Sequence, residues 1–489
     1  MVFNSVHFLV FFAVVYALYR LLPHRWQNWL LLVGSYYFYA AWDWRFLGLL
    51  LASTIIDFYC GLYIASRDSR PQRKAALVLS LTFNLSMLGF FKYFNFFAAN
   101  LQGLFGSLGL HVGLTALHVL LPIGISFYTF ITMSYVIDVY RRQIEPTRHL
   151  LDFALFVAYF PHLVAGPILR ASLLLPQIVR RREITADQLT EGLWLILFGF
   201  FKKMFVADNL ATIANAVFSP SAHPTGFEVL LGVYAFAFQI YGDFSGYSDI
   251  ARGTSKLMGI ELNLNFRFPY FVRTPQEFWA HWHMSLSAWL RDYLFLPIGY
   301  ALSRRLDGVR WFGLRDDLWI YAGATMVTML LGGLWHGAAW TFVLWGAYQG
   351  VLLVVFMLAT RMRRRRARTR AAATRTRWRR ALEVTGMFHL TCLGWLIFRA
   401  DSLGQFATLA SSLVTRFDPS LKALIEYGVP LALTVGPLLV IHGIEFANDD
   451  LSIEMRWPFA VISTVCVALT YLIVLFGNFE GTQFIYFQF

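Results

Sequence analysis

The chain has 489 residues, of which 58% are hydrophobic, 18% aromatic and only 14% charged, and its formal net charge is +13. An ordinary soluble domain carries about 25% charged residues, so this composition excludes a soluble globular protein. Apolar runs that approach the ~20 residues needed to cross a bilayer recur from end to end. The sequence therefore predicts an all-helical protein that crosses a membrane many times.

The predicted membrane spans follow one another with short connections. Two further apolar pieces, 151–169 and 289–302, contain prolines that predict broken, re-entrant or interfacial helices. No internal repeat and no soluble segment interrupts the series, so we expect one membrane domain over residues 1–489, with about 11 to 13 spanning or re-entrant helices. The predicted spans are residues 6–22, 29–41, 46–65, 76–96, 117–140, 192–206, 227–250, 319–334, 338–359, 382–398, 429–446 and 459–476.

Lysine and arginine residues gather at alternating ends of these spans, which the positive-inside rule assigns to the cytoplasm. Both termini are then expected on the outer side. The tract 361–380 alone holds eleven arginines and no acidic residue. We interpret it as a cytoplasmic loop that rests on anionic lipid, where each cation gains about 1 kcal/mol. An arm for nucleic acid or for an acidic partner is the alternative interpretation, and no nucleic-acid partner is expected.

The stretch LGGLWHGAAW at 331–340 places His336 inside a hydrophobic run. A titratable ring at membrane depth needs a partner, and such residues usually mark a substrate, ion or proton path. The unperturbed imidazole pKa of about 6.5 lets this side chain give or take a proton near neutral pH. A histidine that only packs between helices is the alternative. The neighbouring Gly332, Gly333 and Gly337 permit close approach of a backbone or ligand, which favours a functional residue.

Two further polar clusters interrupt the apolar pattern. Asp243, Tyr247 and Asp249 end a predicted span, where carboxylates are expected to be paired or to line a cavity; a plain cytoplasmic helix end is the alternative. His281 and His283 form an HxH pair, but residues two apart point to different faces of a helix and no third ligand stands nearby, so no metal is expected. Helical spacing predicts instead one tryptophan-rich interfacial helix through His283.

Several motifs, in order along the chain, resemble the membrane-bound O-acyltransferases, and in particular the bacterial branch that supports O-acetylation of exported polysaccharides such as alginate. They are YFPHLVAGPILR (159–170), YGDFSGYSDIARG (241–253), WHMSLSAWLRDYLFLPIG (282–299), LLGGLWHGAAWTFVLWG (330–346) and the terminal FIYFQF (484–489). The resemblance implies an all-helical fold with a central tunnel through the bacterial inner membrane. It implies that His336 and His283 are catalytic, and the candidates for lining the tunnel or substrate site are Trp335, Trp282, Asp243, Tyr247, Asp249 and Arg291.

Transfer of acetyl from a thioester to a hydroxyl requires the hydroxyl proton to leave as the carbonyl is attacked, and a positioned base accelerates such a step by roughly 10²–10⁴-fold. We expect His336 to be that base and His283 to orient it or to polarise the carbonyl; a covalent acetyl-histidine is the alternative. No bound cofactor is expected. The expected donor is a cytosolic acetyl thioester, most simply acetyl-CoA, drawn to a mouth that contains Lys202, Lys203, Arg267 and Arg273.

The predicted external loops are too short to build a polysaccharide-binding domain. We therefore expect the acetyl group to pass across the membrane to a periplasmic acetyltransferase of the SGNH or a similar type, within a complex for polysaccharide synthesis and export. A lipid or lysophospholipid O-acyltransferase is one alternative. A transporter or flippase is another, although transporters usually show internal repeats.

The C-terminal FIYFQF carries four aromatic residues beyond the last predicted span. Aromatic side chains anchor many protein contacts, so we expect this segment to dock the periplasmic partner. An interfacial aromatic belt is the alternative. The docking candidates are Phe484, Tyr486, Phe487 and Phe489.

Overall fold

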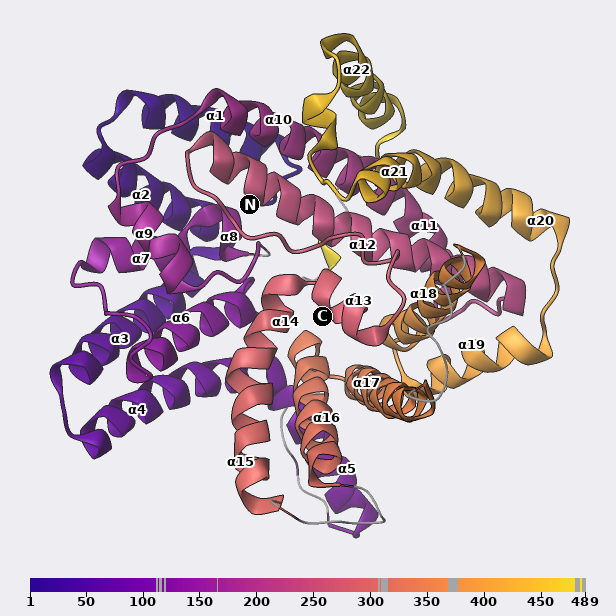
Figure 1. Ribbon diagram of the computed structural model, residues 1–489, viewed down its shortest axis with the longest axis horizontal. Helices are drawn as coiled ribbons and strands as arrows, with labels where there is room; N and C mark the ends of the chain where they lie inside the picture. Colours follow the sequence, from indigo (N-terminus) through magenta and orange to yellow (C-terminus); the bar gives the residue numbers. More distant parts are fainter. Residues whose placement is uncertain are drawn as a thin grey trace. The chain divides into compact units, whose positions relative to one another are not determined.

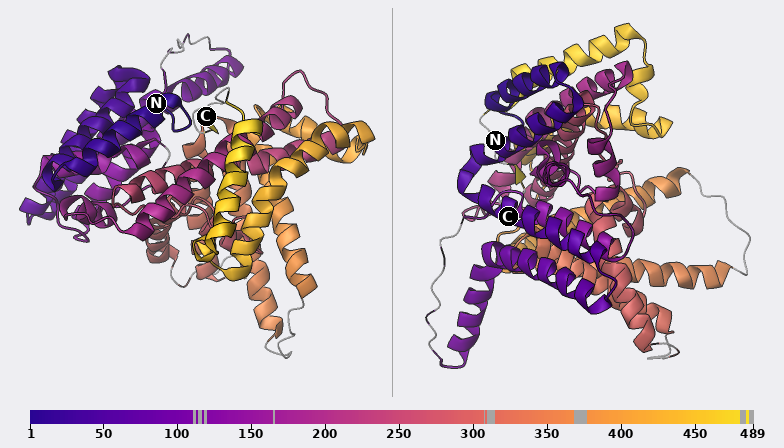
Figure 2. Two further views of the ribbon diagram at one scale, coloured as in Figure 1. Left: turned by 90° about the horizontal axis from the view of Figure 1, so that it is seen from above. Right: turned by 90° about the vertical axis from the view of Figure 1, so that its left-hand side faces the viewer.

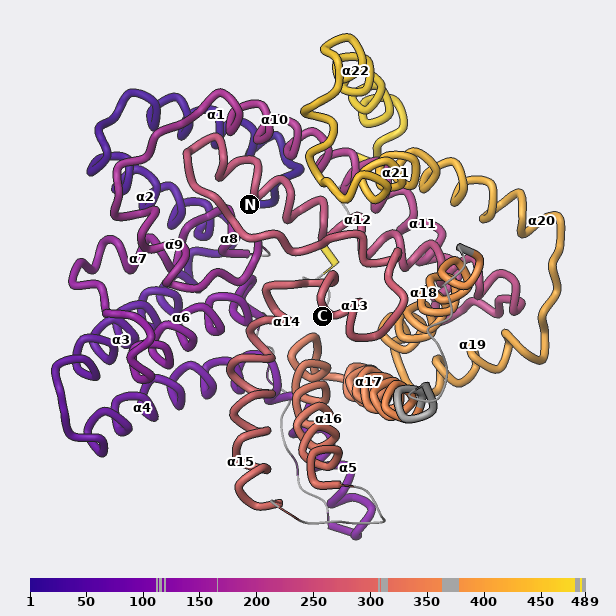
Figure 3. The backbone as a smooth tube through the Cα atoms, viewed as in Figure 1, coloured from indigo at the N-terminus to yellow at the C-terminus, as the bar shows by residue number. Residues whose placement is uncertain are grey.

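The computed structural model describes residues 1–110, 120–164, 166–306, 315–367, 377–479 and 484–485, together with residues 113, 117 and 308; Figure 3 traces the backbone. Within these ranges the chain is helical and contains no strand, so the all-helical prediction is confirmed. The chain groups into two compact units. The first comprises Met1–Phe200 and Gly246–Asn263, and the second comprises Phe201–Ser245 and Leu264–Phe489.

The first unit holds the N-terminal helices and the last turns of α12. Helices α3, α4 and α6 lie side by side in it (Figure 1). Its elements are α1 (Val6–Leu21), α2 (His24–Asp43), η1 (Trp44–Phe46), α3 (Leu47–Ser66), α4 (Arg70–Leu88), the π-helical η2 (Gly89–Tyr93), α5 (Phe94–Ser107), α6 (Ile125–Tyr140), α7 (Leu150–Ala158), α8 (Phe160–Leu163), α9 (Ala171–Val179) and α10 (Ala186–Phe200).

A polar network fills the contact between α3 and α4. Asp57 accepts hydrogen bonds from Ser80 Oγ at 2.5 Å and from Asn84 Nδ2 at 2.8 Å, and Ser53 Oγ donates to Asn84 Oδ1 at 2.8 Å. All four side chains are buried. Because bonds to water are absent in such an interior, these side-chain hydrogen bonds hold the helices together.

The second unit holds the C-terminal helices and the first part of α12. Helices α16 and α17 form its most extensive contact and lie side by side (Figures 1 and 2). Its elements are the π-helical η3 (Phe201–Ala207), α11 (Asp208–Val217), α12 (Gly226–Leu257), α13 (Pro275–His281), α14 (Met284–Leu290), the π-helical η4 (Arg291–Phe295), α15 (Leu296–Leu306), α16 (Asp316–His336), α17 (Trp340–Ala367), α18 (Arg377–Arg399), α19 (Leu403–Thr415), α20 (Leu421–Ala423), the π-helical η5 (Leu424–Gly428), α21 (Val429–Asn448), η6 (Ile453–Arg456) and α22 (Phe459–Phe476).

Seven helical stretches among the described residues are long and apolar enough to cross a membrane, and α1 is a shorter apolar helix. The chain is therefore a multi-pass membrane protein. The other expected spans correspond to shorter or more polar helices. The seven stretches are His24–Ser66, Arg70–Ser107, Asp316–His336, Trp340–Met362, Trp378–Arg399, Leu421–Asn448 and Phe459–Phe476.

Several boundaries differ from the predicted spans. The span predicted over 117–140 begins as a helix only at Ile125, because Gly124 adopts a left-handed conformation with φ of +75°. The stretch 151–169 breaks after Ala158, as its prolines predicted. The stretch 289–302 does not break: the π-helical η4 continues directly into α15, whose second residue is Pro297.

The contact between α16 and α17 depends on glycine. A Cβ atom at Gly333 would lie 2.2 Å from the carbonyl oxygen of Phe342, and one at Gly346 would lie 2.3 Å from the carbonyl oxygen of Met329. Neither space admits even a methyl group, because the nearest atoms belong to backbone. The two helices therefore touch backbone to backbone beside the end of α16.

We predict that Gly333→Ala destabilises the protein by about 1–3 kcal/mol, because the added methyl must push α16 and α17 apart. Thermal unfolding in detergent measures the change. Gly386→Ala is the matched control, since nothing lies within 4 Å of a Cβ at that position of α18. Equal melting temperatures for the two variants would contradict the account of the helix contact.

Candidate active site

His336 is the last residue of α16, and its ring is enclosed by aromatic side chains. The imidazole centroid lies 5.0 Å from the ring of Trp335, 5.0 Å from Trp345 and 5.3 Å from Phe398. Helix α16 ends directly after this residue, where Gly337 has an extended backbone, and a Cβ at Gly337 would lie 2.1 Å from the ring of Phe342. The glycines around His336 thus place the imidazole in the interior, where only 4% of the residue is exposed.

His283 lies at a sharp bend between α13 and α14. Its φ and ψ are +41° and +54°, in the left-handed region that side chains other than glycine rarely adopt. The prediction of one tryptophan-rich helix through this residue is wrong, because the bend separates Trp282 from Met284. Strained backbone of this kind clusters at functional sites.

Asn265 supports the bend at His283. Its carbonyl oxygen accepts from the Met284 N–H at 2.9 Å, and its Oδ1 accepts from Ser285 Oγ at 2.7 Å. These bonds cap the beginning of α14 from a different segment of the chain, since His283 makes no side-chain cap. The sequence gives no local signal for this role of Asn265.

The His283 ring is fully buried and packs at 4.6 Å from Phe244 and at 6.1 Å from Trp335. Burial lowers the pKa of His283 to about 3, so the imidazole is neutral across the physiological range. Trp335 contacts both His283 and His336. The structure therefore gathers the two predicted catalytic histidines around one indole.

Two more of the predicted tunnel residues lie in the same unit. Trp282 is buried and packs at 4.9 Å from Trp395. Arg291 pairs with Asp292 at 2.7 Å and lines a pocket of about 220 Å³ between α14, η4, α16 and α17. This pocket is also lined by Leu290 and Met329. Leu290 is seven residues after His283, and Met329 is seven residues before His336, so each lies about two helical turns from a histidine.

Asp243 belongs to a buried ion-pair cluster. Lys203 Nζ lies 2.8 Å from Asp208 Oδ1 and 2.8 Å from Asp243 Oδ1, and all three side chains are buried. The second carboxylate oxygen of Asp243 accepts a hydrogen bond from the backbone N–H of Ile485 at 2.6 Å. Asp243 therefore anchors the C-terminal segment to α12.

Tyr247 and Asp249 belong to the first unit. Tyr247 stacks on Phe3 at 4.2 Å, and Asp249 pairs with Arg252 at 3.3 Å. The expectation that ionisable groups in this motif are paired is thus met by both carboxylates.

The expected cytoplasmic mouth is wrong for its two lysines. Lys202 and Lys203 are buried in η3: Lys203 forms ion pairs with Asp208 and Asp243, and the Lys202 ammonium lies 5.9 Å from the Tyr241 ring. The two arginines of the expected mouth are ion-paired: Arg267 with Asp449 at 2.8 Å and Arg273 with Glu277 at 2.8 Å.

The prediction that Phe484 docks a partner is also wrong. Only 2% of Phe484 is exposed, and its ring packs at 5.9 Å from Phe244, the same ring that contacts His283. Phe484 is the first residue of FIYFQF and directly precedes Ile485, whose N–H donates to Asp243. This bond holds the segment so that the Phe484 side chain lies in the core. Tyr486, Phe487 and Phe489 lie outside the described residues.

A buried polar chain in the second unit was not predicted from the sequence. The Tyr241 hydroxyl oxygen lies 2.9 Å from His442 Nε2, and His442 Nδ1 lies 2.5 Å from Glu445 Oε2. Glu454 is fully buried beside Glu445, and burial, together with the charge of Glu445, raises the pKa of Glu454 to about 8. His442 and Glu445 stand three apart within an apolar span, and this spacing in such a context could have identified them.

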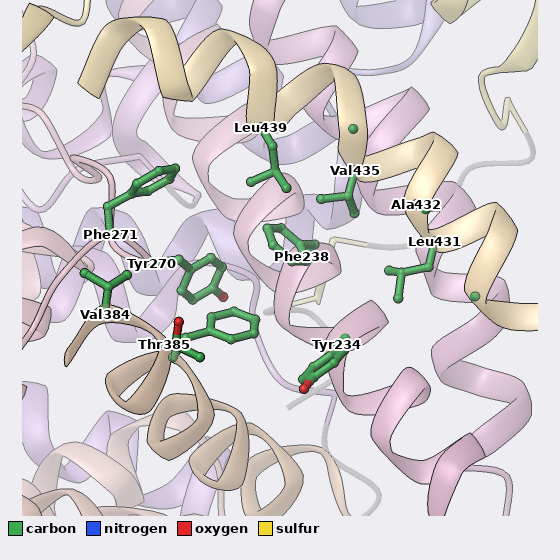
Figure 4. Close-up of a pocket in the computed structure, with 13 residues that line it drawn as sticks. Tyr234, Phe238, Tyr270, Phe271, Val384, Thr385, Leu431, Ala432, Val435 and Leu439 are labelled. Atoms are coloured by element: carbon green, nitrogen blue, oxygen red, sulfur yellow. The ribbon is translucent and has the colours of Figure 1, made fainter. Parts of the chain in front are cut away.

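An apolar pocket of about 510 Å³ lies between α12, α18 and α21 (Figure 4). The hydroxyl of Tyr270 donates to the carbonyl oxygen of Ala237, and that of Tyr234 bonds to His389 Nε2 at 2.7 Å, so both polar atoms are occupied. Phe238 and Leu439 line the pocket. Phe238 is three residues before Tyr241, and Leu439 is three residues before His442. The polar chain therefore lies about one helical turn beyond the pocket.

We predict that Asp243→Asn costs about 1.5–3 kcal/mol of stability, because the neutral amide weakens the charge-assisted bonds to Lys203 and to the Ile485 N–H, while Asp208 still balances the Lys203 charge. The Ile485 amide should exchange with solvent faster, which hydrogen exchange of the C-terminal peptide measures. Asp249→Asn is the control, since its more exposed pair with Arg252 should contribute about 0–1 kcal/mol. Similar effects of the two variants would contradict the anchoring role.

Comparison with known proteins identifies the family of this chain. The profile of the membrane-bound O-acyltransferase family matches residues 8–398, which include both histidines. The chain is 43% identical over 405 residues to "probable alginate O-acetylase AlgI" of Azotobacter vinelandii, with 82% of this chain and 76% of that protein covered.

Two more distant relatives share the likeness. The chain is 31% identical over 473 residues to the peptidoglycan O-acetyltransferase of Helicobacter pylori, with 91% of this chain and 84% of that protein covered. It is 27% identical over 278 residues to the teichoic acid D-alanyltransferase of Bacillus subtilis, with coverage of 56% and 68%. The chain belongs to the membrane-bound O-acyltransferase family and is an O-acyltransferase.

Proposed function

We propose that this protein takes an acetyl group from a cytosolic thioester, most simply acetyl-CoA, and passes it across the inner membrane for O-acetylation of an exported polysaccharide such as alginate. The names of the relatives support a polymer of the cell envelope as the destination. The single observation that carries the proposal is the position of His336, a buried imidazole at the end of α16 that shares Trp335 with His283.

The reaction needs one base. The hydroxyl oxygen of the acceptor attacks the thioester carbonyl, the C–S bond breaks, and the hydroxyl proton must reach the leaving thiolate. His336 accepts that proton from the hydroxyl and returns it to the thiolate, so the residue is neutral again at the end of the cycle. The aromatic wall formed by Trp335, Trp345 and Phe398 excludes water, which would otherwise hydrolyse the thioester.

His283 acts in this proposal as a neutral hydrogen-bonding group. Its low pKa makes it a poor proton carrier near neutral pH, while a neutral imidazole still donates one hydrogen bond and accepts another. The strained bend supported by Asn265 fixes the direction of the ring. His283 therefore polarises the thioester carbonyl or orients His336.

The pocket lined by Arg291 is the proposed approach for the donor. The pocket lies about two helical turns from the histidines, along α14 and α16. Arg291 supplies a cation for a phosphate of the donor. On the outer side, a periplasmic acetyltransferase of the SGNH or a similar type receives the acetyl group and esterifies the polymer. Both termini are proposed to lie on that side.

A lipid O-acyltransferase is the second candidate, because the apolar pocket between α12, α18 and α21 offers about 510 Å³ of space to an acyl chain (Figure 4). A chase of radiolabelled acetyl donor separates the two functions. The proposal expects the label in extracellular polymer when the polysaccharide genes are present. Label that accumulates in membrane lipid and never reaches polymer would overturn it.

We predict that His336→Ala lowers the rate of polymer acetylation by roughly 10²–10⁴-fold, because the base that accepts the hydroxyl proton is lost. Expression, membrane insertion and melting temperature should stay close to wild type. His223→Ala, which changes an exposed histidine between α11 and α12, is the matched control. Normal acetylation by well-expressed His336→Ala protein would refute the assignment.

We predict that His283→Gln keeps the pH dependence of the rate between pH 5 and 8. The pKa of His283 in the folded protein is about 3, so its ring stays neutral between pH 5 and 8 and does not contribute to the titration of the rate in that range. The amide keeps a donor and an acceptor, so His283→Gln should retain more activity than His283→Ala. If the wild-type pH–rate profile changes near pH 6.5 and this change disappears in His283→Gln, then His283 titrates during catalysis, contrary to this account.

A further inference from the structure

A polar pocket of about 280 Å³ lies in the first unit, where α3 and α6 end and α4 begins. It is lined by Arg67 and Asp68 after α3, by Arg73 in the first turn of α4, and by Arg142 and Glu145 after α6. None of these five side chains forms an ion pair with another residue in the described part of the chain. Three arginines and two acidic residues thus line one small space.

Arg142 occupies a position that normally belongs to glycine. Helix α6 ends in a Schellman motif, in which the Arg142 N–H donates to the Val139 carbonyl at 3.0 Å and the Gln143 N–H donates to the Asp138 carbonyl at 2.9 Å. The residue in the left-handed position of this motif is usually glycine. Arg142 adopts it with φ of +60°. The strain indicates that a side chain is needed at this point.

Arg73 is held in a fixed orientation at the same place. Its Nη2 donates to the Tyr140 carbonyl oxygen at 2.6 Å, and its guanidinium carbon lies 5.3 Å from the centre of the Tyr140 ring. Its buried Nε has no hydrogen-bond partner among the described residues. A planar guanidinium with donors to spare matches the oxygens of a phosphate.

We propose that this pocket binds a phosphate group with an ammonium group next to it, the chemistry of phosphoethanolamine. Arg67, Arg73 and Arg142 hold the phosphate, and Asp68 and Glu145 face the ammonium. Topology anchoring alone explains arginines at helix ends. It does not explain an arginine where glycine fits the backbone better, nor two carboxylates in the same pocket.

The ligand has two possible sources, a phospholipid headgroup and a soluble phosphate ester. The test measures binding to the full chain in detergent at low ionic strength, with short-chain phosphatidylethanolamine, short-chain phosphatidylglycerol and soluble O-phosphoethanolamine as probes. Preference for the phosphatidylethanolamine over O-phosphoethanolamine assigns the site to lipid, and the reverse preference assigns it to a solute. Tighter binding of phosphatidylglycerol than of phosphatidylethanolamine would overturn the role of the carboxylates and with it the proposal.

Arg142→Gly is the main variant, because glycine suits the left-handed backbone and the melting temperature should be unchanged or higher. It should weaken binding at least about tenfold, the effect of losing one charge-assisted hydrogen bond. Arg67→Gln, at a second lining residue, should weaken binding in the same direction. Arg148→Gln is the matched control, since Arg148 is exposed in the same connection but does not line the pocket. Equal binding by wild type and Arg142→Gly, or an equal loss in Arg148→Gln, would overturn the proposal.

Discussion

The backbone contact between α16 and α17 determines the position of His336, and the other residues of the candidate site surround His336. Gly333 and Gly346 let the helices meet without side chains between them. The same contact brings Trp345 of α17 against the His336 ring at 5.0 Å. Trp335, one residue earlier in the chain, faces His283. A change in this contact would therefore displace His336 and alter its relation to His283.

The burial of charge explains much of the remaining structure. An ionisable side chain in an apolar interior needs a partner, and the partners here are local and specific. Asp57 accepts hydrogen bonds from Ser80 and Asn84, and Lys203 forms ion pairs with both Asp208 and Asp243. These two networks join helices, and the second also holds the C-terminal segment against α12. The side chains that pack against His336 and His283 are mainly aromatic, which suits a reaction that must exclude water.

Much of the fold and of the site could be predicted from the sequence. Long apolar runs identified the spans, and a histidine within one of them identified His336, because both signals are local. The bend at His283 could not be predicted, since it depends on Asn265, which lies outside the motif. The burial of Phe484 and of Lys203 was also missed, because each depends on Asp243, which is far from Phe484 in the sequence. Local patterns reveal the need for a partner but not the identity of that partner.

Transfer of acetyl across the membrane through His336 is the central claim of this account, and sided proteoliposomes test it most directly. The purified protein is reconstituted in one orientation, with labelled acetyl-CoA and the periplasmic acetyltransferase with its polymer on opposite sides. The account predicts labelled polymer only when the donor is on the side of the 361–380 tract, and labelling roughly 10²–10⁴-fold slower with His336→Ala protein. Equal labelling with the donor on either side, or labelling by the His336→Ala protein at the wild-type rate, would contradict it.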